Sequence, residues 1–405
     1  MPWKETSVVD QRKRFVQDYY RQVFSVAELC RRYGVSRETG YKWVRRFEDE
    51  GVPGLEDRSR RPHSCAHATP SYVVEALVKA RRRRPYWGAK KFLALLHRHH
   101  PDWPLPAPST AHEILKRHGL VPAPKRRTRR PHPGRPTTAI TEPNRIWTID
   151  FKGQFKTRNG VYCYPLTLQD GFSRFLLACD GLLHPTILLT KPTLVRVFRK
   201  LGLPAIIRSD NGTPFASSAL GRLSTLSVWW IRLGIYPELI EPSQPQQNGR
   251  HERMHRTLKR HTARPPAANL REQQRRFDAF RQEFNHERPH EALDQNPPAS
   301  VYSPPTRVYP SRLPPIEYPG HFEVRLVSRN GGIRWNSRWV NVSHLLAEQY
   351  VGLEEIDDSL WQVYFGSVEL GRLHEREGRI IDSLGRKARR KRANHKEPLS
   401  GMSPE

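Results

Sequence analysis

The stretch "RIWTIDFKG" at residues 145–153, followed by "GVYCYPLTLQDGFSRFLLACDG" at 160–181, decides the fold of this chain. The first segment alternates residue by residue, as expected of a strand with two different faces. Its two faces carry Trp147, Ile149 and Phe151 on one side and Ile146, Thr148 and Asp150 on the other. The second segment consists of two apolar runs around Asp170-Gly171, which predicts a β-hairpin.

Helices and strands then alternate. "PTLVRVFRKLG" predicts a helix with Pro192 in its first turn and Gly202 at its end. "LPAIIRSDNG" from 203 and "IYPELIEP" from 235 predict short strands, and "LGRLSTLSVWWIRLG" from 220 predicts a helix between them. Three strands followed by alternating helices and strands predict an α/β core with a mixed sheet flanked by helices.

Composition limits the partners. The chain has 405 residues, which corresponds to two to four domains at about 150 residues each. Its 69 basic residues outnumber 40 acidic ones and give a net charge of +29, which favours a nucleic acid over a membrane surface or a ribosome-type structural role. No signal core or long apolar run occurs, and four scattered cysteines fit a reducing cytosol. We expect neither a membrane nor a small molecule as partner.

The N-terminal segment "SVAELCRRYGVSRETGYKWVRRF" at 25–47 predicts two helices joined by a tight glycine turn. Ser25 and Ser36 are the expected N-caps. This order is typical of a helix-turn-helix, with an ordinary basic helical hairpin as the alternative. The expected DNA contacts of the second helix are Arg37, Lys42, Arg45 and Arg46.

A second helical unit follows, with its last helix expected to start at Ser109 or Thr110 and to end at Gly119. In the proline-rich linker behind it, Lys125, Arg126 and Arg127 are suited to track a phosphate backbone. The expected division is 1–52 helix-turn-helix, 53–70 linker, 71–121 second helix-turn-helix, 122–140 basic linker, 141–303 core, 304–320 proline-rich linker, 321–385 small antiparallel β-barrel, and 386–405 basic disordered tail.

Three acids stand out in the core. Asp150 lies inside the first strand, Asp210 ends a buried strand, and Glu252 lies one turn into a basic helix. Phosphodiester chemistry on two divalent ions needs such oxygen ligands from rigid elements. Each acid also has an ordinary interpretation: a strand-edge acid, a turn former, and a partner of Arg256. Asp170 is interpreted as the hairpin turn.

The helix "GRHERMHRTLKRH" at 249–261 separates two kinds of residue by spacing. Asn248, His255, Arg256 and Lys259 share the face of Glu252, at i−4, i+3, i+4 and i+7. Met254 and Leu258 are expected to face the core. The candidate phosphate contacts of the core region are Lys152, Asn248, Arg250, Arg253, Arg256 and Lys259.

Five ordered motifs carry a resemblance. They are "WTIDFKG", "LQDGFSRF", "IIRSDNGTPF", "PSQPQQNGRHERMHRTLK" and "FNHERPHEAL" with "PPASVY". Together, over roughly residues 141–303, they resemble the integrase core of bacterial insertion-sequence transposases, which is of the retroviral-integrase, ribonuclease-H-like kind. "SVAELCRRYGVSRETGYKWVRRF" and "YWGAKKFLALL" are similar to the paired helix-turn-helix modules of that family.

The resemblance implies a function. Asp150, Asp210 and Glu252 fall on the family's catalytic and metal-binding acids, which hold two Mg²⁺ or Mn²⁺ ions per site. The implied enzyme binds terminal inverted repeats, frees 3′-hydroxyl ends and joins them to target DNA as a homo-oligomer on double-stranded DNA. A bacterial, nucleoid-associated cytoplasmic protein is expected. The alternatives are a non-catalytic DNA-binding regulator with an integrase-like fold and a ribonuclease-H-type nuclease.

Overall fold

The computed structural model describes residues 7–59, 68–122, 138–241, 249–383 and 385. The chain divides into two compact units, Met1–Ala68 and Thr69–Glu405, and each is considered by itself. The predicted C-terminal tail and most of the predicted basic linker lie outside the described residues.

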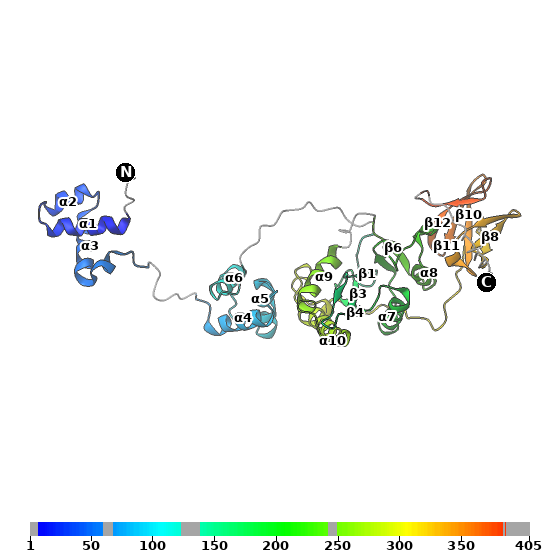
Figure 1. Cartoon of the computed structure of the whole chain (residues 1–405), viewed down its shortest axis with the longest axis horizontal. Coiled ribbons are helices and arrows are strands. Elements are labelled where there is room, and N and C mark those ends of the chain that lie inside the picture. The colour runs from blue at the N-terminus through cyan, green and yellow to red at the C-terminus, as the bar shows by residue number, and fades with distance from the viewer. Residues whose placement is uncertain (1–6, 60–67, 123–137, 242–248, 384, 386–405) are drawn as a thin grey trace, which may run out of the picture. The chain divides into compact units, whose positions relative to one another are not determined.

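The first unit is a compact helical module (Figure 1). Ser7, Ser25 and Ser36 each accept a backbone N–H of the helix that they cap, as expected for the last two. Leu55 is fully buried in the core of the module, so this core continues past the predicted boundary at residue 52. The elements are α1 (Val8–Tyr20), α2 (Val26–Arg32), α3 (Arg37–Glu50) and the 3₁₀ turn η1 (Val52–Leu55).

The second unit begins with three helices that bury Trp87 and Phe92. The last of them starts at Pro108 with Ala107 as its N-cap, and not at Ser109 or Thr110 as predicted. Proline suits the first helical position because its missing N–H would be unpaired there in any case. The helices are α4 (Ser71–Arg83), α5 (Ala89–His99) and α6 (Pro108–Arg117).

A mixed sheet forms the centre of the second unit, as predicted. β1 pairs antiparallel with β3 and parallel with β5, and β5 pairs parallel with β6. The sheet order is β2-β3-β1-β5-β6, with β4 also paired to β3 in the expected hairpin. The strands are β1 (Ile146–Phe151), β2 (Phe155–Lys156), β3 (Tyr162–Asp170), β4 (Leu176–Leu182), β5 (Ile206–Ser209) and β6 (Tyr236–Leu239).

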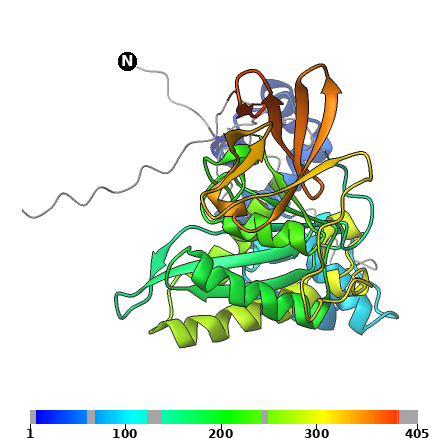
Figure 2. The same cartoon turned by 90° about the vertical axis from the view of Figure 1, so that its right-hand side faces the viewer.

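Helices cover both faces of this sheet (Figures 1 and 2). The face with Trp147 and Ile149 packs against α7 (Ile187–Leu201) and α8 (Thr225–Arg232). The opposite face, which carries Thr148 and Asp150, lies under α9 (Gly249–Thr262), with α10 (Leu270–Gln282) beside it. The alternation of β1 therefore places an acid between the sheet and α9.

Two predicted helices differ in length from the structure. α7 begins at Ile187, so Pro192 lies inside the helix instead of in its first turn. α8 is shorter than the segment 220–234, because Gly221 and Arg222 have positive φ angles and Ser224 caps a new start. The side chain of Ser224 accepts the N–H of Ser227, which fixes this start.

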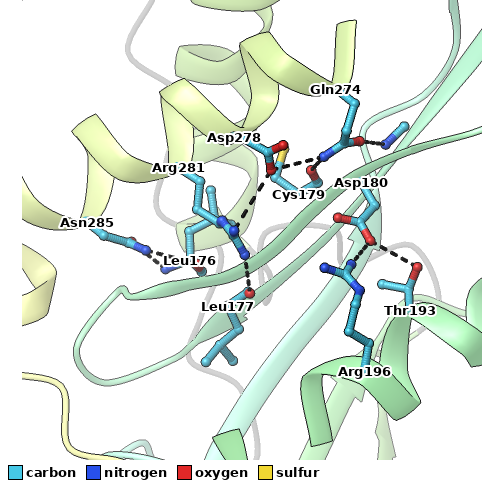
Figure 3. Close-up of polar contacts among 11 residues, drawn as sticks. Leu176, Leu177, Cys179, Asp180, Thr193, Arg196, Gln274, Asp278, Arg281 and Asn285 are labelled. Atoms are coloured by element: carbon cyan, nitrogen blue, oxygen red, sulfur yellow. Dashed lines mark hydrogen bonds and ion pairs between the residues drawn. The ribbon is translucent and has the colours of Figure 1, made fainter. Parts of the chain in front are cut away.

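Side chains of α10 and the π-helical turn η4 (Glu283–Glu287) cover the free edge of β4 (Figure 3). The Asn285 amide accepts from the Leu176 N–H and donates to the Leu176 carbonyl. Gln274 pairs in the same way with Gly181 N–H and the Cys179 carbonyl, and Arg281 donates to the Leu177 carbonyl. These groups take the place of a neighbouring strand and prevent edge-to-edge pairing.

The C-terminal region is antiparallel β, as predicted (Figure 2). Its described strands form a five-stranded sheet, β13-β12-β11-β10-β7, and a separate β8-β9 pair, and no ladder among them closes a barrel. Both sheets share one apolar core, to which Leu223 and Ile231 also belong. The strands are β7 (Glu323–Leu326), β8 (Gly332–Trp335), β9 (Arg338–Asn341), β10 (Tyr350–Asp357), β11 (Leu360–Phe365), β12 (Val368–His374) and β13 (Arg379–Ile381).

Candidate active site

Asp150 and Asp210 come from neighbouring parallel strands. The last paired positions of β1 and β5 are Thr148 and Arg208. Asp150 lies two residues further along β1, and Asp210 is the first residue after β5, so both acids lie near the carboxyl ends of these paired strands. The sheet thus brings together two acids that are 60 positions apart in the sequence.

The Asp150 carboxyl group lies in an environment that opposes its ionisation. Its side chain is 20 % exposed. Burial, followed by the negative charge of Asp210 and, more weakly, that of Glu252, raises the pKa of Asp150 to about 7, although Lys152 acts in the opposite direction. The negative charges of two further acids therefore oppose ionisation of Asp150, and a divalent cation would relieve this repulsion.

Asp210 occupies the turn that follows β5. Its Oδ1 accepts the Gly212 N–H at 3.3 Å, and burial raises the pKa of this carboxyl group. A Cβ at Gly212 would lie 3.2 Å from Asp210 Oδ2, so glycine leaves room beside the carboxylate. Asn211 donates to the Ile240 carbonyl at 2.9 Å and fixes the turn to the end of β6.

A hydrogen-bonded network fastens α9 to the sheet under Asp150. Thr167 Oγ1 lies 2.6 Å from Nε2 of both His251 and His255, and it donates to the Asp150 carbonyl at 3.1 Å. Because that carbonyl can only accept, all three contacts are satisfied when both imidazoles donate to Thr167. His251 Nδ1 also lies 2.8 Å from Thr148 Oγ1.

The two histidines of this network are neutral groups. Burial lowers the pKa of His251 to about 3 and lowers that of His255 still further. His255 Nδ1 lies 3.6 Å from Asp150 Oδ2. Because His255 is neutral, this contact is not an ion pair between full charges. Sequence reasoning placed His255 on the face of Glu252 and missed its burial. The i,i+4 spacing of the two histidines, with Met254 and Leu258 also buried, is the signal that could have revealed it.

Glu252 lies on the exposed side of α9 and lines a cleft of about 510 Å³ together with Asp150. Its other charged lining residues are Lys152, Arg256, Lys259, Arg260 and Arg264. Asp210 is not among the lining residues. The cleft thus combines carboxylates with a cationic wall, which suits a phosphodiester that approaches a carboxylate-bound cation.

The residues that were predicted to contact DNA lie at several different positions in the structure. Lys152, Arg256 and Lys259 line the cleft with Glu252, whereas Arg250 and Arg253 line a different pocket on the other side of α9. In the first unit, Arg37, Lys42 and Arg45 are exposed on α3, and Arg46 is half-buried beside Trp43. Lys125, Arg126, Arg127 and Asn248 lie outside the described residues.

The donor set fits a hard divalent cation in its chemistry. Asp150, Asp210 and Glu252 offer only carboxylate oxygens, which Mg²⁺ prefers. Burial, and then the charges of Asp210 and Glu252, raise the pKa of Asp150. Among the described residues, no group of three or more Asp, Glu, His or Cys side chains is already arranged around one metal position. The geometry therefore shows Asp150 and Asp210 near the ends of adjoining strands, and Asp150 and Glu252 in one cleft.

Comparison with protein families identifies the core. Residues 140–245 and 233–298 match two models described as "Integrase core domain". Residues 11–63 match a "Helix-turn-helix domain", and residues 39–115 match a "Homeodomain-like domain". Residues 140–298 of the chain, which contain the mixed sheet, thus match an integrase core. Together with the helix-turn-helix matches, this confirms the resemblance drawn from the sequence motifs.

Two viral polyproteins are among the relatives that the chain resembles. The Pol polyprotein of feline endogenous virus ECE1 is 34 % identical over 123 residues, and the Gag-Pol polyprotein of baboon endogenous virus (strain M7) is 34 % identical over 122. Each match covers 30 % of this chain, and the chain spans only 11 % and 7 % of those polyproteins.

Two solved structures are similar to parts of the chain. A simian T-cell lymphotropic virus intasome with PP2A regulatory subunit B56 gamma contains a chain that is 18 % identical, with a TM-score of 0.36; the match covers 72 % of this chain and 97 % of that one. The HTLV-2 integrase catalytic core with magnesium is 16 % identical, with a TM-score of 0.32, over 40 % of this chain and 98 % of that one.

Proposed function

We propose that this chain is a DNA transposase. It would bind terminal inverted repeats through its helix-turn-helix modules and would act as a homo-oligomer on DNA. The observation that carries the proposal is the position of Asp150 and Asp210 on adjoining strand ends, with Glu252 across a cleft walled by cations. We also propose that the protein is located in the bacterial cytoplasm and is associated with the nucleoid. No helix among the described residues is long and apolar enough to cross a bilayer.

The chemistry proposed for this site has two rounds. In the first, water attacks a phosphorus atom at the element's end, and the 3′ oxygen departs with a proton as a hydroxyl group. In the second, that 3′ hydroxyl attacks a phosphorus atom of the target, so that one P–O bond forms while another breaks and no external energy source is needed. When bound, two Mg²⁺ or Mn²⁺ ions would activate the attacking oxygen and stabilise the departing one.

The residues of the chain have distinct roles in this proposal. Asp150, Asp210 and Glu252 would hold the divalent ions. Arg256 and Lys259 would bind non-bridging phosphate oxygens and so orient the scissile group. His251 and Thr167 would hold α9 in register with the sheet, which positions Glu252 opposite Asp150.

The test uses the full chain with supercoiled plasmid or oligonucleotides of the element's own ends, in Mg²⁺ or Mn²⁺. We expect metal-dependent nicking and joining by the wild type. Asp210→Asn should lose both activities and keep DNA binding, as measured by a mobility shift.

The alternative is a non-catalytic DNA-binding regulator, which the raised pKa of Asp150 next to two further acids disfavours. Wild-type protein that binds its correct ends but never nicks or joins them with either metal would support the regulator.

A further inference from the structure

A second pocket lies on the side of α9 away from the Glu252 cleft. It has a volume of about 200 Å³ and takes Arg250, Arg253, Met254 and Thr257 from α9. Arg174 enters it from the β3–β4 turn, and Arg288 and His290 enter it from the segment after η4. Three stretches that are far apart in the sequence therefore direct basic side chains to one position.

Cationic side chains outnumber acidic ones in the lining of this pocket. Lys91, Arg174, Arg250, Arg253 and Arg288 are its cationic lining residues, and Glu291 is the single carboxylate among the lining residues. Glu291 is exposed and is already paired with Lys90 at 3.1 Å. In the part of the chain that the structure describes, none of the four arginines makes an ion pair.

Two donors in the pocket have no acceptor. Arg174 Nε and Arg288 Nη1 are buried and have no hydrogen-bond partner among the described residues. Arg250 does have a partner, because its Nη1 donates to the Gly171 carbonyl at 3.1 Å. Buried guanidinium N–H groups without acceptors are costly, and an oxyanion would satisfy them.

Electrostatics agrees with this geometry. Burial, then the charges of Arg250 and Arg253, lowers the pKa of Arg174 to about 10. Burial, then the charge of Arg288, lowers the pKa of Lys91 to about 8. Both groups are still mainly protonated near neutral pH, so the pocket keeps a concentrated positive charge that an anion would stabilise.

We propose that this pocket binds one phosphate group of a DNA backbone, at a position separate from the reacting phosphodiester. The inference rests on the proposed function for the identity of the polymer. The volume is below the roughly 300 Å³ at which small-molecule sites begin, so it fits a phosphate group and not a whole nucleotide.

α9 connects the pocket to the cleft. The helix with its side chains is about 10 Å across, and a DNA strand advances about 3.4 Å per nucleotide, so about three nucleotides would bridge the two sides. A strand held in the pocket would therefore have its register set relative to Asp150 and Glu252. The pocket would thus fix which phosphodiester of the strand that crosses α9 reaches Asp150 and Glu252.

The test compares full-length wild type with Arg288→Gln and Arg253→Gln. Arg253 is exposed and no side-chain hydrogen bond is described for it, so its replacement leaves a folded variant even where loss of Arg288 does not. The matched control is Arg275→Gln on α10, an exposed arginine away from both sites. Each protein is heated in millimolar inorganic phosphate and in chloride at equal ionic strength, and its affinity for duplex DNA is measured over a range of salt.

Phosphate should raise the melting temperature of wild type and control, and the pocket variants should lose most of that rise. Their plot of log affinity against log salt should be shallower by about 0.9, the amount expected for one lost phosphate contact. Equal phosphate shifts in all proteins would overturn the site. A lost phosphate shift with an unchanged salt slope would overturn the DNA assignment and indicate a site for free phosphate.

These readouts do not depend on catalysis. If the wild type never nicks or joins DNA, but the phosphate shift and the slope difference between wild type and pocket variants are observed, the proposed function is wrong and the phosphate site is supported. If the wild type is active and neither effect is observed, only the phosphate site is wrong.

Discussion

Asp150 and Asp170 are two aspartates of one sheet with opposite surroundings, the first partly exposed and the second fully buried. Asp170 is 0 % exposed, and its carboxylate accepts from Asn144 N–H at 2.8 Å, from Ser173 N–H at 2.7 Å and from Ser173 Oγ at 2.5 Å. Asp150 instead faces the charges of Asp210 and Glu252 and a neutral His255. Burial raises the pKa of both groups, but only in Asp170 do three protein donors offset it.

The comparison shows that burial alone does not mark a functional acid. Asp170 closes the β3–β4 turn and needs nothing from outside the protein. Asp150 is held where its charge is opposed, so a bound cation is what would make its ionised form favourable. If Asp150 is a functional acid and Asp170 a structural one, their substitution should have different effects on activity, stability and pH dependence.

The largest effect is expected on activity. Asp150→Asn should lower metal-dependent strand joining on the order of 10³-fold, because a metal ligand contributes several kcal/mol to the barrier and about 1.4 kcal/mol corresponds to a factor of ten. Asp170→Asn should keep near wild-type activity per folded molecule, measured by plasmid joining normalised to the folded fraction. An equally inactive but folded Asp170 variant would contradict the assignment of Asp150 as functional and Asp170 as structural.

The next effect is on stability. Asp170→Asn should destabilise the core by about 3 kcal/mol, because an amide places N–H groups where a carboxylate accepted three bonds. Asp150→Asn in metal-free buffer should be neutral or stabilising, since it removes an opposed charge. Urea unfolding followed by circular dichroism measures both, and the opposite ranking would contradict this view.

A smaller change should come from one donor of Asp170. Ser173→Ala removes the hydroxyl but keeps the Ser173 and Asn144 backbone donors, so we expect a loss of about 1.5 kcal/mol. The same denaturation experiment applies, with Ser173→Thr as the conservative control. No loss of stability would mean that the two backbone donors suffice.

The smallest effect concerns pH. The pKa of Asp150 is raised to about 7 from an unfolded value of 3.8, so the folded state holds the proton more tightly. Stability is therefore lost as pH rises above the unfolded value and levels off above about 7. From pH 6 to pH 8 without metal, the loss should be about 1.4 kcal/mol. Asp150→Asn should abolish this slope, and an equal slope in the variant would exclude Asp150 as its source.

The sequence by itself predicted most of the elements of the core and proposed three acids as candidate site residues. Alternation in "RIWTIDFKG" predicted the two faces of β1, and serine caps predicted the starts of α2 and α3. These features were predictable because they depend on local periodicity and on backbone groups a few residues away. The starts of α7 and α8 were missed, since positive φ angles at Gly221 and Arg222 and the tolerance of Pro192 depend on packing.

Only the tertiary structure decided what surrounds each side chain. It brought Asp150 near Asp210 through the pairing of β1 with β5, buried His255 against Thr167, and separated Arg253 from Arg256 on two sides of α9. Helical spacing shows which residues share a face of their own helix, but some partners of that face come from segments more than a hundred residues distant. Charge and hydrogen bonding across such distances arise only when the chain has folded, and so the role of each acid and arginine follows from its neighbours in space.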